Sequence, residues 1–189
     1  NLGQSNLIEE YPLDDGRSLS DLDRAPLALG ALTAGITVRD MTDAFATFAN
    51  GGVIREGRTF TKVFDSDGNL IIDNQQETRK ILSEKTVDYM NMCLFYATYY
   101  GTGTEADLEY HYVAGKTGTT NDNYDRYFVG YTPYYSAAVW TGYDQNEKIS
   151  YSGSPAIDMW RKVMEKVHAE LERKEFHVPD GGLMSVKIC

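Results

Sequence analysis

The chain has 189 residues, a formal net charge of −10 and a pI of about 4.7. This length suits one domain with a sizeable core, or part of a larger domain. Because the net charge is negative and no block of lysine and arginine occurs, neither nucleic acid nor an anionic membrane surface is an expected partner. The two cysteines, Cys93 and Cys189, are far apart, and the three histidines form no H-E-x-x-H motif, so we expect no disulfide framework, no metal and no other cofactor.

The sequence contains no run of about eighteen apolar residues and no charged leader with a cleavage site, so we expect no membrane contact by this segment itself. It begins at Asn1 without an initiator methionine and ends at Cys189 within a strand-like apolar stretch. We therefore interpret residues 1–189 as a piece of a larger domain, with any signal or anchor outside it.

Residues 1–36 are punctuated by proline, glycine and aspartate and show no clear period, so loops are expected there. A helix is predicted to begin after Thr37, whose side chain can form an N-terminal capping pair with Asp40, and to end before Gly51. Its apolar residues recur at helical spacing and predict one buried face: Met41, Ala44, Phe45, Phe48 and Ala49.

Two apolar segments, residues 60–64 and 70–72, flank Asp67-Gly68, which predicts a β-hairpin with a two-residue turn. Residues 65–69 also resemble a calcium-binding loop. Their glycine, however, stands at the fourth position instead of the sixth, and no glutamate closes the loop. The hairpin is therefore the preferred interpretation.

A second helix is predicted to begin at Ser83 and to end at the glycine-rich turn 101–104. Its inward residues are Val87, Met90 and Leu94. Three segments rich in valine and aromatic residues follow, at 112–117, 127–132 and 136–142, and predict adjacent antiparallel strands.

A last helix is predicted to open at Ser154-Pro155, with Asp158 in its first turn, and to pack across the sheet. Its apolar stripe comprises Ile157, Trp160, Val163, Met164, Val167 and Leu171. The charged residues expected to face solvent are Lys162, Glu165, Lys166, Glu170 and Glu172.

The stretch from Lys116 to Thr120 places a lysine and three hydroxyls on one short strand. Side chains alternate along a strand, so Lys116, Gly118 and Thr120 are expected on one face and Thr117 and Thr119 on the other. Because Gly118 has no Cβ, a ligand backbone can approach this edge, and free N–H groups can then stabilise an oxyanion. A phosphate-binding P-loop is excluded because it requires a glycine where this chain has Tyr110.

Four blocks of the sequence, in the same order, resemble the transpeptidase domain of class A penicillin-binding proteins. This resemblance covers nearly the whole chain and implies an α+β fold shared with serine β-lactamases, an antiparallel sheet flanked by helices, present only as its C-terminal part. The four blocks are residues 28–52, 101–106, 114–121 and 128–144.

The resemblance implies a D,D-transpeptidase that cross-links peptidoglycan stem peptides through a serine acyl-enzyme and also binds β-lactam antibiotics. It implies catalytic roles for Lys116 and Thr119, with the Thr119 N–H as an oxyanion donor. It also assigns substrate contacts to the following residues: Thr102, Gly103, Thr117, Gly118, Thr119 and Thr120. The implied location is the extracytoplasmic face of the bacterial cell membrane, with the anchor upstream.

The family's S-x-x-K motif, which carries the nucleophile, occurs nowhere in the sequence. In the family this motif precedes the region matched here, so truncation is the preferred explanation, and the upstream part of the domain becomes an expected partner. Two alternatives stay open. A non-catalytic peptidoglycan-binding or β-lactam-sensing module predicts a parent gene without an upstream S-x-x-K, whereas a serine β-lactamase fits poorly with the 101–106 block.

Overall fold

A three-stranded antiparallel sheet lies at the centre of the computed structural model, which describes residues 7–30, 32–33, 35–145 and 147–177. Its strands are β7 (Ala114–Thr119), β8 (Asp125–Tyr131) and β9 (Ser136–Gly142), in the order β7-β8-β9. Ala114 lies opposite Tyr131, and Tyr131 lies opposite Ser136. The predicted strands are therefore confirmed, with the first shifted by two residues toward Thr119.

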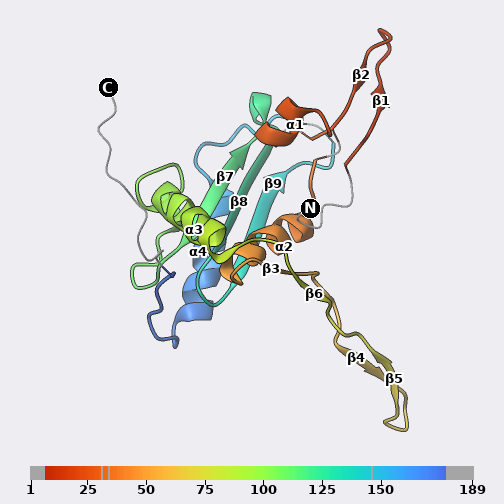
Figure 1. Ribbon diagram of the computed structural model, residues 1–189. Helices are drawn as coiled ribbons and strands as arrows, with labels where there is room; N and C mark the ends of the chain where they lie inside the picture. Colours follow the sequence, from red (N-terminus) through yellow and green to blue (C-terminus); the bar gives the residue numbers. More distant parts are fainter. Residues whose placement is uncertain (1–6, 31, 34, 146, 178–189) are drawn as a thin grey trace.

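Helices cover both faces of this sheet (Figure 1). On one face lie α2 (Val38–Ala49) and α3 (Glu84–Tyr99), where Phe48 and Leu94 pack with Tyr131 of β8. On the other lies α4 (Pro155–His168), which packs on Phe128 of the same strand. Side chains of residues 128 and 131 point to opposite faces, as the period of a strand requires.

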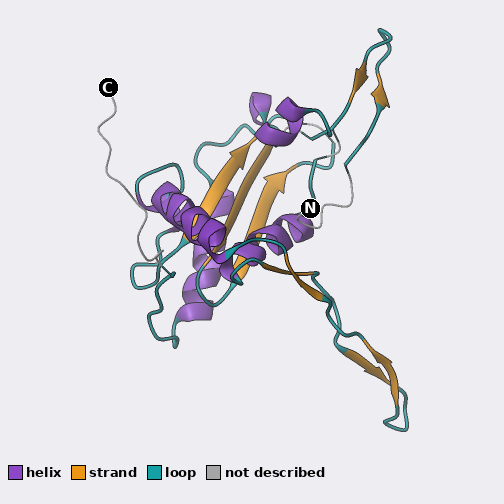
Figure 2. Cartoon of the chain, in the orientation of Figure 1, coloured by secondary structure: helices purple, strands orange, loops and turns teal. Residues whose placement is uncertain are grey.

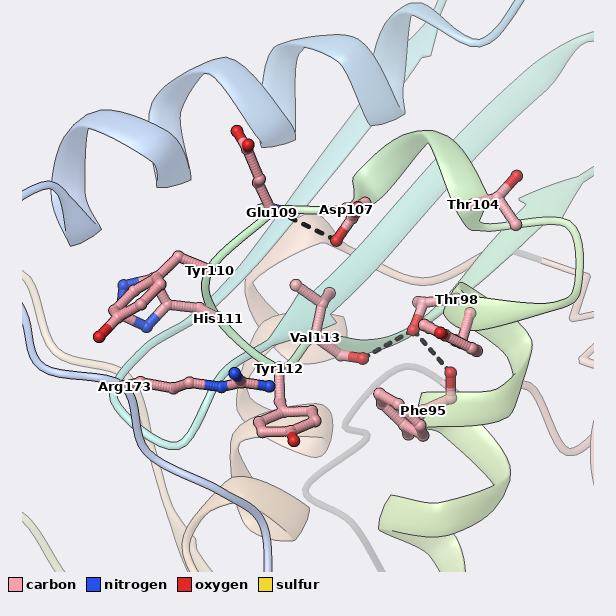
Figure 3. A pocket seen from close by; sticks show the side chains of 11 residues that line it. Phe95, Thr98, Thr104, Asp107, Glu109, Tyr110, His111, Tyr112, Val113 and Arg173 are labelled. Carbon is pink, nitrogen blue, oxygen red and sulfur yellow. Dashed lines mark hydrogen bonds between the residues drawn. The ribbon is translucent and has the colours of Figure 1, made fainter.

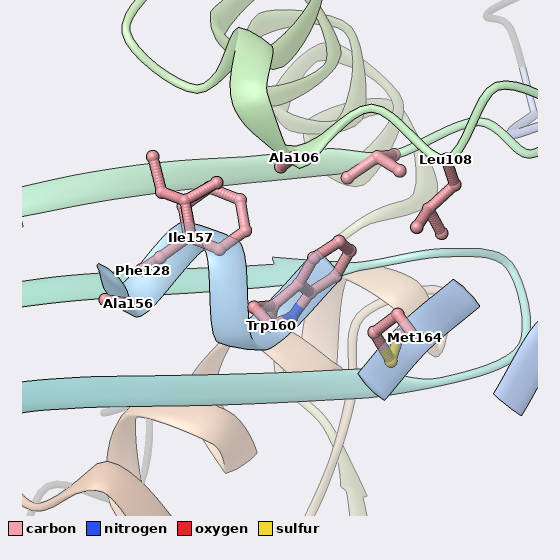
Figure 4. Close-up of a cluster of buried hydrophobic side chains, with 8 residues drawn as sticks. Ala106, Leu108, Phe128, Ala156, Ile157, Trp160 and Met164 are labelled. Atoms are coloured by element: carbon pink, nitrogen blue, oxygen red, sulfur yellow. The ribbon is translucent and has the colours of Figure 1, made fainter. Parts of the chain in front are cut away.

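The core beneath α4 is the larger of the two apolar clusters (Figure 4). Trp160 is 1% exposed, its ring meets Phe128 edge-to-face with centroids 5.1 Å apart, and its Nε1 donates to the Ala137 carbonyl at 3.0 Å. Gly130 permits this packing, since a Cβ there would lie 2.8 Å from Phe128 and 3.0 Å from Trp160. Burying each large apolar side chain contributes about 1.5–3 kcal/mol. The full cluster comprises Ala106, Leu108, Val113, Phe128, Ala156, Ile157, Trp160 and Met164.

All three predicted helix starts are confirmed, two of them by side-chain caps. Thr37 Oγ1 accepts from Asp40 N at 3.0 Å, and Ser83 Oγ accepts from Thr86 N at 3.2 Å. Each bond satisfies one N–H that the first turn of a helix leaves without an intrahelical partner. Local sequence therefore decides where these two helices begin.

The predicted apolar stripe of α4 was partly wrong. Val163 and Val167 are 52% and 44% exposed, whereas His168 is buried. The buried face runs through Ile157, Trp160, Met164 and His168, and positions 163 and 167 fall on its flank because successive residues of a helix are rotated by about 100°. Leu171 lies beyond the end of the helix, while the five charged residues predicted to face solvent are exposed.

Two hairpins project from this body (Figure 2). One consists of β1 (Tyr11–Pro12) and β2 (Ser18–Leu19) and is followed by the short helix α1 (Arg24–Leu29). These elements replace some of the loops expected before residue 36. Their anchor is Asp21, which is fully buried and whose carboxylate accepts from Ile8 N at 2.9 Å and Thr33 N at 2.7 Å.

The second projection leaves α2 through β3 (Val53–Arg55), reaches the hairpin of β4 (Lys62–Phe64) and β5 (Leu70–Asp73), and returns through β6 (Thr78–Lys80). The predicted two-residue turn was wrong, because Asp65 N donates to Asn69 O at 3.0 Å and so closes a three-residue loop with Gly68 at φ 85°. The Asp65 carboxylate accepts from Asp67 N and Asn69 N, which ties it to the turn.

Candidate active site

The K-T-G sequence, Lys116-Thr117-Gly118, lies on an open edge of the central sheet. Strand β7 pairs with β8, and no other strand pairs with it among the residues that the structure describes. Alternate N–H and C=O groups of an edge strand point away from the sheet. An extended ligand can therefore add to this edge through main-chain hydrogen bonds.

Two hydroxyls meet at this edge. Thr102, in the turn after α3, lies with its Oγ1 2.7 Å from Thr117 Oγ1. Lys116 Nζ donates to the Thr117 carbonyl at 3.0 Å and reaches Thr117 Oγ1 at 3.3 Å. The structure thus brings Thr102 to the K-T-G strand, although fifteen positions separate it from Thr117 in the sequence.

Helix α3 ends in a tight turn that explains this approach. Gly103 N donates to the Ala97 carbonyl at 3.0 Å, and a Cβ at Gly103 would lie 3.2 Å from that same oxygen. Thr98, on the last turn of α3, donates from Oγ1 to the Val113 carbonyl at 2.6 Å and so fixes the helix to the start of β7. Gly103 itself is buried and shapes the turn. The exposed residue of this turn that faces the K-T-G strand is Thr102.

A shallow cavity of about 350 Å³, the K-T-G cleft, lies along this strand. Thr117, Gly118 and Thr119 form one wall, as the alternation of the strand leads one to expect for the two threonines. Gly118 is exposed, and a Cβ there would meet only Tyr127 Cβ, at 3.3 Å. The other residues that line the cavity are Thr102, Glu105, Asn123, Arg126, Tyr127, Gly153, Ser154 and Ile157.

Thr120 stands apart from this cavity. Its Oγ1 accepts from Asp125 N at 2.8 Å and donates to the Asp125 carboxylate at 3.2 Å. These bonds close the turn between β7 and β8, which also contains Asp122 and Asn123 at positive φ. The hydroxyl of Thr120 is thereby engaged in the turn.

Arg126 is a cationic wall residue that the sequence interpretation missed. It lies opposite Thr119 in the sheet, its Nε donates to Asn123 Oδ1 at 2.8 Å, and its guanidinium carbon lies 5.4 Å from the centre of the Tyr151 ring. A second bond, to the Gly153 carbonyl, completes its fixation. The available signal was the strand register, which places residue 126 beside the K-T-G sequence once the turn length is known.

Tyr127 joins this wall to the segment before α2, because its hydroxyl donates to the Ile36 carbonyl at 2.7 Å. Burial, and secondarily the negative charge of Asp125, raises the pKa of Tyr127 above its ordinary value of 10.0. The phenol therefore remains a donor to the Ile36 carbonyl up to a higher pH than an exposed tyrosine would.

Taken together, the edge offers a row of hydroxyls, the fixed guanidinium of Arg126 and the exposed ammonium of Lys116, which does not itself line the cavity, to an anionic, extended ligand. Arg126 and Lys116 supply the positive charge, and the hydroxyls belong to Thr102, Thr117 and Thr119. Such donors suit a carboxylate or a developing oxyanion. Within the described residues, no three His, Cys, Asp or Glu side chains gather closely enough to hold a metal, and no helix has the length and apolarity needed to cross a membrane.

Comparisons with known proteins identify the family that shares this arrangement. The family described as the penicillin binding protein transpeptidase domain matches residues 3–165. The chain therefore belongs to the transpeptidase family of penicillin-binding proteins.

Relatives place it among the class A members of this family. It is 35% identical over 175 residues to penicillin-binding protein 1A of Clostridium acetobutylicum. This alignment covers 90% of this chain and 22% of the relative. It is 34% identical over 145 residues to penicillin-binding protein 4 of Bacillus subtilis, covering 76% and 23%. The chain thus spans less than a quarter of the length of these relatives.

Solved structures of the same family share the fold. Penicillin-binding protein 1A from Haemophilus influenzae superposes with a TM-score of 0.70 at 19% identity, covering 82% of this chain and 29% of the other. PonA1 from Mycobacterium tuberculosis superposes with a TM-score of 0.65 at 23% identity, covering 82% and 47%. The expected α+β transpeptidase fold, with an antiparallel sheet flanked by helices, is therefore confirmed.

Proposed function

We propose that this chain supplies the K-T-G wall of a peptidoglycan D,D-transpeptidase that acts through a serine acyl-enzyme and is acylated by β-lactams. The observation that carries the proposal is the open edge of β7, where the hydroxyls of Thr102 and Thr117 meet beside Lys116. A stem peptide ending in D-alanine is an extended chain with a terminal carboxylate, and both features match this edge.

Each residue of the strand has a role in this proposal. Thr117 and Thr119 donate to the terminal carboxylate of the donor peptide, with Arg126 and Lys116 supplying positive charge nearby. The exposed Gly118 lets the peptide backbone lie close to the strand. The N–H of Thr119 stabilises the oxyanion that forms when the scissile carbonyl is attacked, a contribution worth about 10²–10³ in rate for one such donor.

The proposal assigns different roles to Thr102, Gly103 and Thr120. Thr102 shares the cavity and positions Thr117 through the bond between their hydroxyls. Gly103 shapes the turn that carries Thr102, and Thr120 closes the turn after β7. We therefore propose that Thr102 contacts the substrate and that Gly103 and Thr120 act by holding its neighbours in place.

The nucleophile is proposed to lie in a part of the transpeptidase domain outside residues 1–189. Two findings support this: the sequence contains no S-x-x-K, and the chain covers only 22% of the clostridial relative. The remaining part of the domain then becomes a partner of the K-T-G edge. Like the anchored class A proteins, the parent protein is proposed to act at the extracytoplasmic face of the cell membrane.

The test is acylation of the full-length parent by a fluorescent penicillin. Lys116→Ala is expected to lower the second-order rate constant of acylation about 10²-fold or more, because a charge that stabilises the reacting centre is lost. Lys162→Ala, which removes an exposed lysine of α4, is the matched control. Residues 1–189 alone are expected to take up no covalent label.

Two outcomes would contradict the proposal. If Lys116→Ala is acylated as fast as the parent, the K-T-G strand has no part in the reaction. If a residue within 1–189 is labelled stoichiometrically, the nucleophile is in this chain. Rapid turnover of penicillin by the parent would instead identify a β-lactamase.

A further inference from the structure

A second cavity, of about 280 Å³, lies next to the K-T-G cleft between the end of α3 and the segment that leads into β7. Figure 3 shows Asp107 and Glu109 on this segment, Phe95 and Thr98 on α3, and Arg173 beside Tyr112. The two cavities share one short stretch of chain: Thr102 and Glu105 line the K-T-G cleft, and Thr104 and Asp107 line the second cavity.

Several aromatic side chains line this cavity, and two of the tyrosines are more than half exposed to solvent. Tyr99 and Tyr110 line the cavity and are 59% and 58% exposed, and Tyr100, which follows α3 outside the cavity, is 75% exposed. Phe95 stacks on Tyr99 with ring centroids 5.4 Å apart, and Tyr96 stacks on Tyr100 at 5.9 Å, so that residues four positions apart form two parallel pairs along α3. Exposed apolar area of this extent, with a phenol hydroxyl on each tyrosine ring, is typical of a binding surface.

The charges around the cavity restrict the ligand. Asp107 and Glu109 are both at its wall, which disfavours an anion. The positive charge that two carboxylates favour is already supplied by Arg173, which lines the same cavity and lies over Tyr112 with its guanidinium carbon 4.5 Å from the ring centre. An apolar segment would take water from both carboxylates without replacing their hydrogen bonds. A neutral ligand with an apolar face and many hydroxyls satisfies all three conditions.

The backbone holds these groups in place. Glu109 adopts φ 56°, which non-glycine residues rarely do, and its N–H donates to Asp107 Oδ1 at 3.1 Å. Tyr110 N donates to the Leu108 carbonyl, so the chain makes a tight turn around Glu109. A strained turn that is fixed by a carboxylate of the same wall is a feature of preorganised binding sites.

We propose that this cavity binds one pyranose ring of a glycan, with the exposed tyrosine rings stacked on its C–H face and the carboxylates and Arg173 hydrogen-bonded to its hydroxyls. The volume is just below the range of about 300–1,000 Å³ that small-molecule pockets occupy, which suits a single sugar. The site takes a neutral sugar, whatever reaction the neighbouring cleft performs.

A consequence follows if the proposed function also holds. A glycan strand held in this cavity would keep the stem peptides attached to it near the K-T-G edge, and tethering of this kind raises the effective concentration of the second ligand. Sugar binding itself does not depend on this consequence, so the two proposals can fail separately.

The probe is chitotetraose, a soluble β-1,4-linked N-acetylglucosamine tetramer, titrated into the protein labelled with ¹³C in its tyrosine rings. Resonances of Tyr99, Tyr110 and Tyr112 are expected to shift, while that of Tyr143, exposed at the far end of β9, is expected to stay. Tyr110→Ala should weaken binding about five- to tenfold, as for the loss of one aromatic stacking contact. Tyr110→Phe should bind within about twofold of the parent, and Tyr143→Ala should be unchanged.

Three results would overturn the proposal. No shift of the pocket tyrosines at about 10 mM sugar would exclude even weak binding. Equal weakening by Tyr110→Ala and Tyr143→Ala would show non-specific contact. Displacement of the sugar by tetramethylammonium, with a tighter fit to the same rings, would identify a cation site. Penicillin acylation of the full-length Tyr110→Ala parent, expected to equal that of the wild type, reports on the cleft independently.

Discussion

Two glycines of β7, Gly115 and Gly118, are expected to differ when each is replaced by alanine: the first substitution should lower stability and the second should affect the cleft. At Gly115 a Cβ would lie 2.7 Å from the Val129 carbonyl oxygen and 2.9 Å from Gly130 Cα, both main-chain atoms of the paired strand. At Gly118 it would meet only Tyr127 Cβ, at 3.3 Å. A backbone atom cannot rotate away, so Gly115→Ala must displace β7 from β8, whereas Gly118→Ala requires a shift of a few tenths of an ångström.

Overpacking of this kind costs about 1–3 kcal/mol, which corresponds to a melting temperature lower by about 2–12 °C in a domain of this size. We therefore expect Gly115→Ala to lower the urea midpoint and the melting temperature, and Gly118→Ala to change stability by less than about 0.5 kcal/mol. Gly118→Ala should instead slow penicillin acylation of the parent, because its methyl group stands on the exposed edge. Equal stability of the two variants, or a larger loss for Gly118→Ala, would refute this reading of the strand.

Two further predictions concern ionisable groups. Burial, and to a lesser degree the charge of His111, holds the pKa of His168 below its ordinary value of 6.5, against the opposing effect of its bond to the Met164 carbonyl. Below pH 6.5 the unfolded chain then binds the additional proton, so stability is full above this pH and falls as the pH is lowered toward the folded-state pKa. The urea midpoint should show this decline in the parent and a shallower one in His168→Gln, and equal slopes would contradict it. The N–H groups of Ile8 and Thr33 lower the pKa of Asp21, so Asp21→Asn should speed amide exchange at those two residues severalfold and leave β8 protected; unchanged exchange would show that the carboxylate is not the anchor.

Sequence patterns predicted those parts of the fold that depend on neighbouring residues. The caps at Thr37 and Ser83 were predicted because each capping partner lies three positions away. The three strands were predicted from their composition, and the K-T-G sequence identified the edge strand. In each case the residues that decide the structure lie close together in the sequence.

Contacts across long intervals were harder to predict. Arg126 reaches the cleft only through the register of β8 against β7, and that register depends on a turn whose Asp122 and Asn123 adopt positive φ. Asp21 anchors the first hairpin through N–H groups thirteen and twelve positions away. Val163 and Val167 were assigned to the core because hydrophobicity cannot tell which flank of a helix the sheet will cover.

The core beneath α4 extends directly into the cleft. Ile157 belongs to the buried cluster with Trp160 and also lines the K-T-G cavity, and the Phe128 ring lies under Gly115, one residue before Lys116. Protein interiors are close-packed and transmit strain, so a change of volume at Trp160 will be felt at the position of the K-T-G strand. In evolution, the shape of this cleft can therefore change through substitutions of buried residues that lie outside it.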